Sequence, residues 1–156
     1  MKKILVTGAN GQLGKCIQDA AAGYPDLEFV FVSREELDIE KAGLVAEYLR
    51  KNNFTHCINT AAYTKVEQAE SEEEKAFAIN AKAVKNLAST CNENQVVLLH
   101  VSTDYVFDGK KRTPYLETDP TNPINVYGAS KIKGEHYIQK ITEKHFILRT
   151  SWLYSQ

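Results

Sequence analysis

The sequence has few cysteines and no long apolar segment. Cys16, Cys57 and Cys91 are odd in number, widely spaced and without a CxxC pair. They predict reduced thiols in a cytoplasmic protein, and neither a disulfide framework nor a metal site. No stretch approaches the ~20 apolar residues that a membrane span needs. The apolar run that begins at Ile4 reaches a glycine too early for a signal peptide, so we expect no membrane association.

An excess of charge of one sign is also missing. The 156 residues include 19 Lys and Arg against 20 Asp and Glu, with a net charge of −1. No run of four or more basic residues interrupts this balance, which argues against binding of nucleic acid. With 43% apolar residues, the chain can bury the core of one ordinary globular domain.

Short apolar segments alternate with longer, helix-compatible ones. The apolar segments are short enough for buried strands and comprise residues 3–7, 28–32, 55–59, 96–102 and 145–149. The helix-compatible segments comprise residues 12–22, 41–51, about 66–94, and 126–143. This alternation predicts an α/β fold, a doubly wound parallel sheet (Rossmann-like) of about five strands with helices on both faces.

Two other segments have a simple structural interpretation. Residues 67–75 (EQAESEEEK) predict the solvated first turns of a helix, with Ser71 as cap and Glu74 at the capping-box position, in preference to an acidic binding site. Residues 108–123 contain three prolines among polar residues and predict a long loop, of the kind that often carries function.

A glycine-rich turn joins the first predicted strand to the first predicted helix. Its sequence, TGANGQLG, occupies residues 7–14. Gly8 allows a tight turn, Gly11 lets the backbone approach a pyrophosphate, and Gly14 lets the helix pack closely on the strand. The helix N-terminus adds N–H groups and a partial positive charge. This context favours dinucleotide binding over mere turn formation, and residues 1–156 are therefore predicted to form a dinucleotide-binding domain.

The end of the second predicted strand bears on the choice of dinucleotide. An NAD site usually places an acid there, which bonds the ribose 2′-hydroxyl. Here the strand runs into Ser33 and Arg34, with no acid before Glu35. A guanidinium pairs well with a 2′-phosphate, so NADPH is favoured. Binding of NADH is also compatible with the sequence, because Arg34 can instead lie over the adenine or in solvent.

Tyr127 and Lys131 lie four residues apart in the last predicted helix. That spacing puts both side chains on one face, roughly 5–6 Å apart at Cβ. An ammonium at this distance stabilises a phenolate, so we expect the pKa of Tyr127 to fall from about 10 toward that of a useful proton donor. The spacing alone also fits two surface neighbours without a catalytic role.

Five motifs together resemble the extended short-chain dehydrogenases/reductases, and most closely the dTDP-4-dehydrorhamnose reductase family. In chain order they are GQLG (residues 11–14), AAYT (61–64), STDYVFDG (102–109), YGASKIKGE (127–135) and RTSWLY (149–154). The combination is more specific than the motifs of the superfamily and extends over essentially the whole chain.

The resemblance implies an activity and a set of site residues. The activity is NAD(P)H-dependent reduction of the 4-keto group of dTDP-4-dehydro-6-deoxy-L-mannose to dTDP-L-rhamnose, a step toward cell-wall polysaccharide. Tyr127 becomes the proton donor, Lys131 its activator and Thr103 the hydroxyl at the substrate carbonyl, while the substrate contacts are Thr103, Asp104 and Trp152. The cofactor residues, taken from the turn, the strand end and the family motifs, are Gly8, Asn10, Gly11, Gln12, Leu13, Gly14, Ser33, Arg34, Asp38, Ile39, Ala61, Ala62, Tyr63, Thr64, Tyr127 and Lys131.

Several of these residues also have an ordinary structural interpretation. Thr103 suits the end of a strand, Asp104 suits a turn cap, and Trp152 suits a packed core, as large aromatic residues usually do. His100, within an apolar segment, is interpreted as a satisfied core histidine and not as a base. The remaining histidines share no metal-ligand spacing.

The length of the chain and its departures from the family pattern limit the activity that we expect. Members of the family run to nearly twice this length and build much of the sugar-nucleotide pocket from the second half. We therefore expect a fragment or a natural truncation that binds cofactor but turns over poorly unless another chain completes the site. A homodimer stays open, although Lys15 and Cys16 stand where some relatives place a metal-binding glutamate.

Two rival functions fit the same residues. One is another extended nucleotide-sugar reductase or epimerase. The other is a non-catalytic NADP-binding regulatory subunit, like that of methionine adenosyltransferase. The joint presence of Thr103, Tyr127 and Lys131 favours catalysis.

Overall fold

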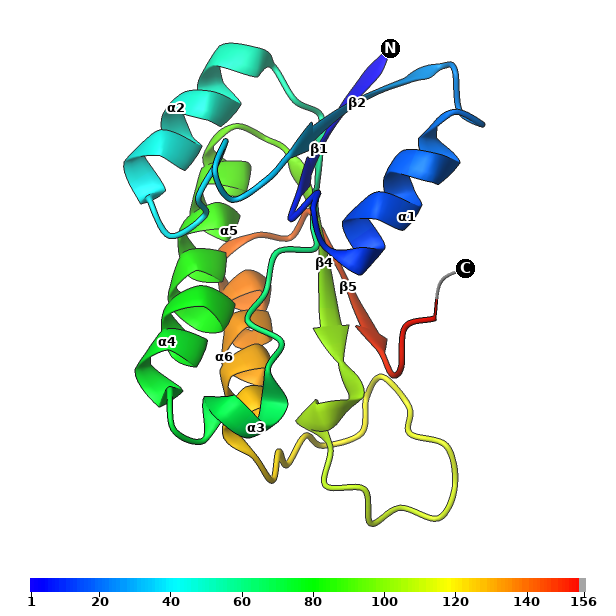
Figure 1. Cartoon of the computed structure of the whole chain (residues 1–156), viewed down its shortest axis with the longest axis vertical. Helices are drawn as coiled ribbons and strands as arrows, with labels where there is room; N and C mark the ends of the chain where they lie inside the picture. Colours follow the sequence, from blue (N-terminus) through cyan, green and yellow to red (C-terminus); the bar gives the residue numbers. More distant parts are fainter. Residues whose placement is uncertain (155–156) are drawn as a thin grey trace.

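The chain folds around a five-stranded parallel sheet in the computed structural model, which describes residues 1–154 (Figure 1). The strand order is β2-β1-β3-β4-β5, and every neighbouring pair runs parallel. All predicted strands are confirmed, with ends that move by no more than one residue: β1 Lys2–Thr7, β2 Leu27–Val32, β3 His56–Asn59, β4 Val97–Thr103 and β5 His145–Thr150.

Three of the four predicted helical segments form single helices. They are α1 (Gln12–Ala21), α2 (Ala42–Asn52) and α6 (Val126–Ile141). The segment predicted over residues 66–94 is instead divided into α3 (Val66–Ala69), α4 (Glu73–Phe77), a π-helical stretch η1 (Ala78–Ala83) and α5 (Val84–Glu93). A 3-10 turn, η2 (Asp104–Val106), follows β4.

The capping prediction within the acidic segment is wrong. Glu72, and not Ser71, precedes α4, and no side chain caps the helix. The Ser71 hydroxyl donates instead to the Gln68 carbonyl at 3.0 Å, because the chain first turns at the end of α3. Most of the acidic side chains are exposed, which confirms a solvated surface.

The helices divide unevenly between the two faces of the sheet. Helix α1 lies against β2 on one face, whereas α2, α5 and α6 lie on the other (Figure 1). Strand β5 reflects this division, since Ile147 packs against the main core while Phe146 and Leu148 on its other face are exposed. The predicted fold class is confirmed, with α1 alone on its face within residues 1–154.

The main core fills the space between the sheet and helices α2, α5 and α6. It contains fully buried leucines from three different elements, Leu5 of β1, Leu87 of α5 and Leu98 of β4. Burial of a leucine side chain contributes roughly 1.5–3 kcal/mol. Ile138 of α6 belongs to the same core, which therefore holds α6 in a fixed relation to the strands.

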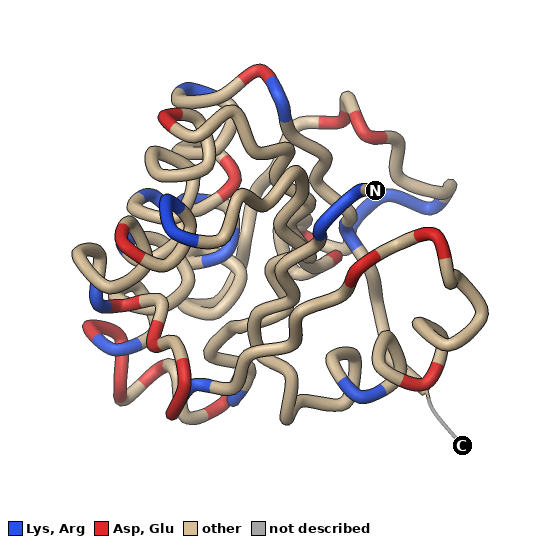
Figure 2. Tube along the Cα trace, turned by 90° about the horizontal axis from the view of Figure 1, so that it is seen from above, with Lys and Arg blue, Asp and Glu red and all other residues tan. Residues whose placement is uncertain are grey.

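Charged residues of both signs are spread over the surface. Lys and Arg are interspersed with Asp and Glu along the trace, and neither sign is confined to one side (Figure 2).

The predicted long loop before α6 is confirmed. Within it, Asp108 accepts hydrogen bonds from Tyr115 Oη at 3.0 Å and Asn122 Nδ2 at 3.1 Å. None of the helices in residues 1–154 has the length and apolar character to cross a bilayer.

Candidate functional site

A cavity of about 720 Å³ lies at the carboxyl ends of the strands. The strand order reverses between β1 and β3, and parallel sheets bind ligands in the crevice at such a switch point. Its walls include most of the predicted site residues: Gly8, Asn10, Gly11, Gln12, Leu13, Arg34, Asp38, Ile39, Ala61, Ala62, Thr64, Thr103, Asp104, Tyr127, Lys131 and Trp152.

The glycine turn is as tight as its sequence predicts. Gly8 has a φ of +73°, and a Cβ added to it would lie 2.7 Å from the backbone nitrogen of Ala61. A Cβ on Gly14 would overlap the carbonyl oxygen of Gly8. Gly11 precedes α1 and offers no side-chain cap. The start of α1 therefore presents backbone N–H groups at the cavity, as anion sites at helix N-termini do.

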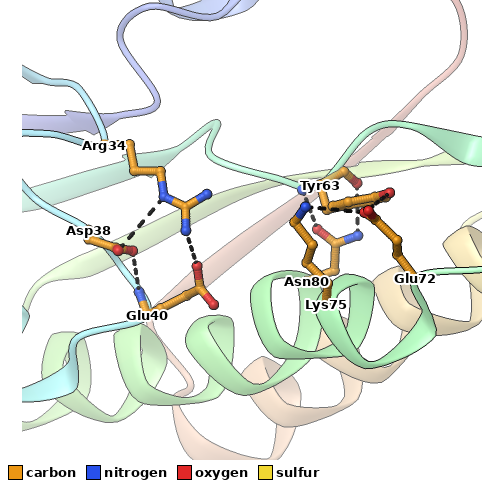
Figure 3. Close-up of polar contacts among 7 residues, drawn as sticks. All are labelled: Arg34, Asp38, Glu40, Tyr63, Glu72, Lys75 and Asn80. Atoms are coloured by element: carbon orange, nitrogen blue, oxygen red, sulfur yellow. Dashed lines mark hydrogen bonds and ion pairs between the residues drawn. The ribbon is translucent and has the colours of Figure 1, made fainter. Parts of the chain in front are cut away.

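Arg34 lies in an ion-pair cluster at the cavity edge (Figure 3). Its Nη2 is 2.5 Å from Glu40 Oε2, and its Nε is 3.7 Å from Asp38 Oδ2. Neither carboxylate partner was foreseen from the sequence, because the chain returns to Arg34 through a turn after β2. Asp38 was predicted at the site, but not as a partner of Arg34.

Local structure places Thr103 and Tyr127 on one wall. Thr103 ends β4, and its hydroxyl accepts a hydrogen bond from the Tyr105 N–H at 3.2 Å, which caps η2. Asn125 caps α6 by accepting from the Gly128 N–H at 2.7 Å, so α6 begins immediately before Tyr127. The rings of Tyr105 and Tyr127 meet edge to face at 5.7 Å. Thr103, and not Asp104, is therefore the turn cap.

The pKa of Tyr127 shifts in the direction opposite to the prediction. Burial raises this pKa, a hydrogen bond with Thr103 lowers it, and the Asp104 carboxylate and Tyr105 raise it further. The prediction failed because burial outweighs the other influences on Tyr127, and because helical spacing does not say where the lysine side chain ends. Lys131 Nζ donates to the Val101 carbonyl of β4 at 2.7 Å.

Lys131 is almost entirely enclosed, with 2% of its surface exposed. Burial lowers its pKa to about 8, and the nearby Glu135 carboxylate acts in the opposite direction. A lysine that carries its charge only up to mildly alkaline pH is unusual, and such residues gather at functional sites. The alternative of two unconstrained surface neighbours does not describe Tyr127 and Lys131.

The stability of the chain is expected to depend on Lys131 above pH 8. Its folded pKa of about 8 lies below the ~10.4 of an unfolded lysine. The unfolded state therefore binds more protons between these values, and stability rises with pH there. Between pH 8 and 10.5 the wild type should gain roughly 2–3 kcal/mol relative to Lys131→Met. Urea unfolding at several pH values measures this difference, and parallel pH profiles would contradict it.

Three predicted cofactor residues lie behind the cavity wall. Gly14 sits in the packing of α1 against the turn. Ser33 is buried, with its N–H donating to Glu36 Oε2 at 2.8 Å. Tyr63 is also buried, and its hydroxyl donates to Glu72 Oε2 at 2.8 Å (Figure 3).

Asn80 supports the site and was missed by the sequence reasoning. Its side chain accepts from the Tyr63 N–H at 2.8 Å and donates to the Tyr63 carbonyl at 3.0 Å (Figure 3). It also donates to Ser130 Oγ at 3.0 Å, and Ser130 in turn donates to the Tyr127 carbonyl at 2.7 Å. Asn80 thereby ties the loop after β3 to α6. No local pattern marks it, because its partners lie 17 and 50 residues away in the chain.

Other wall residues were also unpredicted. They are Glu35, Leu37, Glu40, Thr60, Val66, Ile79, Val101, Ser102, Tyr105, Thr150, Ser151 and Leu153. Thr60 and Thr150 lie at the ends of predicted strands, so the rule that strand ends line the crevice could have found them.

Trp152 and His100 were both given an interpretation as core residues, and the structure agrees for only one of them. Trp152 is 80% exposed and lines the cavity, so the packed-core interpretation of this residue is wrong. His100 is fully buried, as predicted, and its Nδ1 lies 3.0 Å from Asn59 Nδ2. Its Nε2, however, has no hydrogen-bond partner among the described residues. Burial and the charge of Lys131 lower the pKa of His100, which favours the neutral ring.

Together these features define a Rossmann-like α/β domain with the residue set of a short-chain reductase. The glycine turn, the hydroxyl of Thr103, the phenol of Tyr127 and the buried Lys131 share one cavity at the switch point. The model of the family described as the RmlD substrate binding domain matches residues 1–156, and the chain belongs to this family.

Individual relatives agree with this membership. The chain is 42% identical over 154 residues to a dTDP-4-dehydrorhamnose reductase of Sinorhizobium fredii, covering 99% of this chain and 51% of that protein. A dTDP-4-dehydrorhamnose reductase of Bacillus anthracis, solved in complex with NADP, superposes with a TM-score of 0.95 at 40% identity, covering 99% of this chain and 55% of that one. A dTDP-4-keto-6-deoxy-D-glucose reductase of Streptomyces niveus is 37% identical, covering 97% and 53%. The chain thus spans about half the length of the relatives it matches.

Proposed function

We propose that residues 1–156 form the dinucleotide-binding and catalytic part of a dTDP-4-dehydrorhamnose reductase. The reaction is reduction of the 4-keto group of dTDP-4-dehydro-6-deoxy-L-mannose to dTDP-L-rhamnose, with NADPH favoured over NADH. The observation that carries this proposal is the convergence of Thr103, Tyr127 and Lys131 with the glycine turn in one cavity. We further propose a cytoplasmic location, in line with three unpaired cysteines.

The residues around the cavity suit a nicotinamide dinucleotide. Gly8 and Gly14 let the turn and α1 pack directly on neighbouring backbone, where a Cβ would collide, and the uncapped start of α1 suits a pyrophosphate. Arg34 offers a guanidinium at the cavity edge that can receive a 2′-phosphate. The Bacillus anthracis relative holds NADP, which supports the same choice here.

The catalytic residues have separate roles in the proposed reaction. When bound, a reduced nicotinamide supplies the hydride. The hydroxyls of Thr103 and Tyr127 stabilise the negative charge that develops on the carbonyl oxygen, and Tyr127 donates its proton to that oxygen. The raised pKa of Tyr127 keeps the phenol protonated until that step. Lys131 carries its charge at neutral pH, because its pKa is about 8, and from the same cavity wall it can contact the ribose of the nicotinamide.

The chain offers only part of a sugar-nucleotide site. The exposed ring of Trp152 and the carboxylate of Asp104 lie on the cavity wall. An exposed indole gives a flat apolar surface with a polar edge, which suits a base or sugar ring. Because the relatives are about twice as long, we propose that further residues supply the remaining substrate contacts.

Two measurements test this function. NADPH binding to the isolated chain is followed by calorimetry, and NADPH oxidation by the dTDP-keto-sugar is followed by absorbance. The same assay is run on a chimera in which residues 1–156 replace the matching half of the Bacillus anthracis reductase. Binding by both proteins with oxidation by the chimera supports the proposal. Tight binding without oxidation by either protein would favour a non-catalytic regulatory role instead.

The Streptomyces niveus relative raises a second substrate. A dTDP-4-keto-6-deoxy-D-glucose reductase acts on a sugar that differs in configuration from the proposed one, and it is 37% identical to this chain. Both reactions use the same carbonyl chemistry, so the catalytic wall does not distinguish them. In the chimera assay each keto-sugar is supplied in turn. The keto-sugar with the larger kcat/KM is the preferred substrate.

A further inference from the structure

Glu40 forms an ion pair with the guanidinium of Arg34 at the edge of the cavity (Figure 3). Arg34 Nη2 donates to Glu40 Oε2 at 2.5 Å. Both side chains reach solvent, with 61% of Arg34 and 30% of Glu40 exposed. A surface pair of this kind is weak, because water solvates the separated charges nearly as well.

Asp38 fixes the turn that brings Glu40 to Arg34. Asp38 Oδ1 accepts from the Glu40 N–H at 3.0 Å, and Asp38 Oδ2 lies 3.7 Å from Arg34 Nε. Asp38 holds the backbone of Glu40, whereas Arg34 holds its carboxylate. The carboxylate can therefore move away from Arg34 while the backbone of the turn stays in place. The two acids therefore differ in role, one fixed in the turn and one movable.

The corner of the cavity formed by Arg34, Asp38 and Glu40 has a suitable partner for an adenosine ribose with a 2′-phosphate and for one with a 2′-hydroxyl. A 2′-phosphate is a strong bidentate partner for a guanidinium, whereas a 2′-hydroxyl donates to a carboxylate. With the guanidinium of Arg34 against the carboxylates of Asp38 and Glu40, and with Glu35 at the same edge, the corner carries a net negative charge while Glu40 remains in place. A phosphate must therefore displace Glu40, but a hydroxyl need not.

We propose that Glu40 is a built-in competitor for Arg34 and that this competition brings the affinities for NADPH and NADH closer together. The proposal rests on the proposed function, since it assumes that the cavity binds a nicotinamide dinucleotide. Glu40 acts as a specificity-determining residue at the ribose end of the cavity and takes no part in the proton transfer at Tyr127. Its carboxylate stands in for the phosphate when NADH is bound.

Replacement of Glu40 by Gln removes the competing charge with little change in shape. We expect Glu40→Gln to tighten NADPH binding by roughly threefold to fivefold, the range set by a weak exposed pair. The affinity for NADH should stay within about twofold or fall, because the carboxylate acceptor is lost. Calorimetric titration of the full chain with each dinucleotide gives the ratio directly and needs no turnover.

Glu35 provides a matched control for charge alone. It also lines the cavity, beside Arg34 in sequence, but its carboxylate is held chiefly by its own backbone and by Ser33, and Arg34 acts on it less than these groups do. Glu35→Gln removes the same charge from the same edge. An equal gain in NADPH affinity from Glu35→Gln and Glu40→Gln would overturn the competitor role in favour of general repulsion.

A double-mutant cycle with Arg34→Ala separates competition from repulsion. Arg34→Ala should weaken NADPH binding by about tenfold or more and spare NADH. If Glu40 competes for the guanidinium, Glu40→Gln should tighten NADPH binding less in the Arg34→Ala chain than in the wild type. Additive effects would overturn the proposal.

The possible failures are distinguishable. If the wild-type chain binds neither dinucleotide, the proposed function falls and this inference falls with it. If both dinucleotides bind but Glu40→Gln leaves their affinity ratio unchanged, the inference alone is overturned. Thermal unfolding of each variant shows whether the fold is retained, and the exposure of the Glu40 side chain predicts little change in stability.

Discussion

Replacement of Tyr127 by Phe should lower the rate of keto-sugar reduction by about 10²–10⁴-fold and leave NADPH affinity within about twofold. Phe keeps the ring that meets Tyr105 edge to face and removes only the hydroxyl. The proton donor and one of the two hydroxyls at the carbonyl oxygen are then lost together. Turnover is measured in the Bacillus anthracis chimera and affinity in the isolated chain.

Tyr137→Phe is the control for removal of a phenol from α6. Tyr137 lies in the same helix but outside the cavity wall, where its ring lies beneath Lys85 and Lys133. This substitution should leave both turnover and affinity unchanged. A Tyr127→Phe enzyme that keeps more than a tenth of the wild-type rate would remove Tyr127 from the role of proton donor.

Arg149→Ala should destabilise the chain by about 3–5 kcal/mol, the largest loss expected from a single polar substitution here. Arg149 of β5 donates to both oxygens of Glu135 in α6, with Nη2 at 2.7 Å and Nε at 3.1 Å. Glu135 is fully buried and also accepts from Ser102 Oγ at 2.5 Å. Loss of Arg149 leaves that carboxylate buried with its main counter-charge removed. The free energy of urea unfolding measures the effect.

Two comparisons separate this buried pair from an ordinary one. Lys51→Ala breaks the exposed Lys51–Glu47 pair and should cost below about 1 kcal/mol. The double substitution Glu135→Leu with Arg149→Met removes both charges and should be less destabilising than Arg149→Ala alone. Equal losses from Arg149→Ala and Lys51→Ala would mean that water reaches Glu135 and solvates it.

Local signals made the sheet and the glycine turn predictable. Runs of Ile, Val, Leu and Phe mark β1 to β5 to within one residue, because each buried strand needs apolar side chains whatever its neighbours are. The tight turn at Gly8 is likewise a property of a few consecutive residues. Its positive φ of +73° suits a residue without a Cβ.

Contacts between residues far apart in the chain could not be predicted from the sequence. Asn80, which lies in the π-helical stretch, supports the site through hydrogen bonds to Tyr63 and Ser130, 17 and 50 residues away in the chain. The acidic partners of Arg34 depend on a turn geometry that Asp38 stabilises. The pKa of Tyr127 was predicted in the wrong direction, because burial outweighs the helical spacing from which the prediction started.

The fold class, the order of the strands along the chain and the identity of the residues at the strand ends could all be predicted from the amino-acid sequence. These depend on side-chain polarity and backbone preference, which act over a few residues. The direction of the Lys131 side chain, the carboxylate partner of Arg34 and the exposure of Trp152 became known from the folded chain. Those outcomes depend on the dielectric surroundings and partners that distant segments bring together, and no local pattern encodes them.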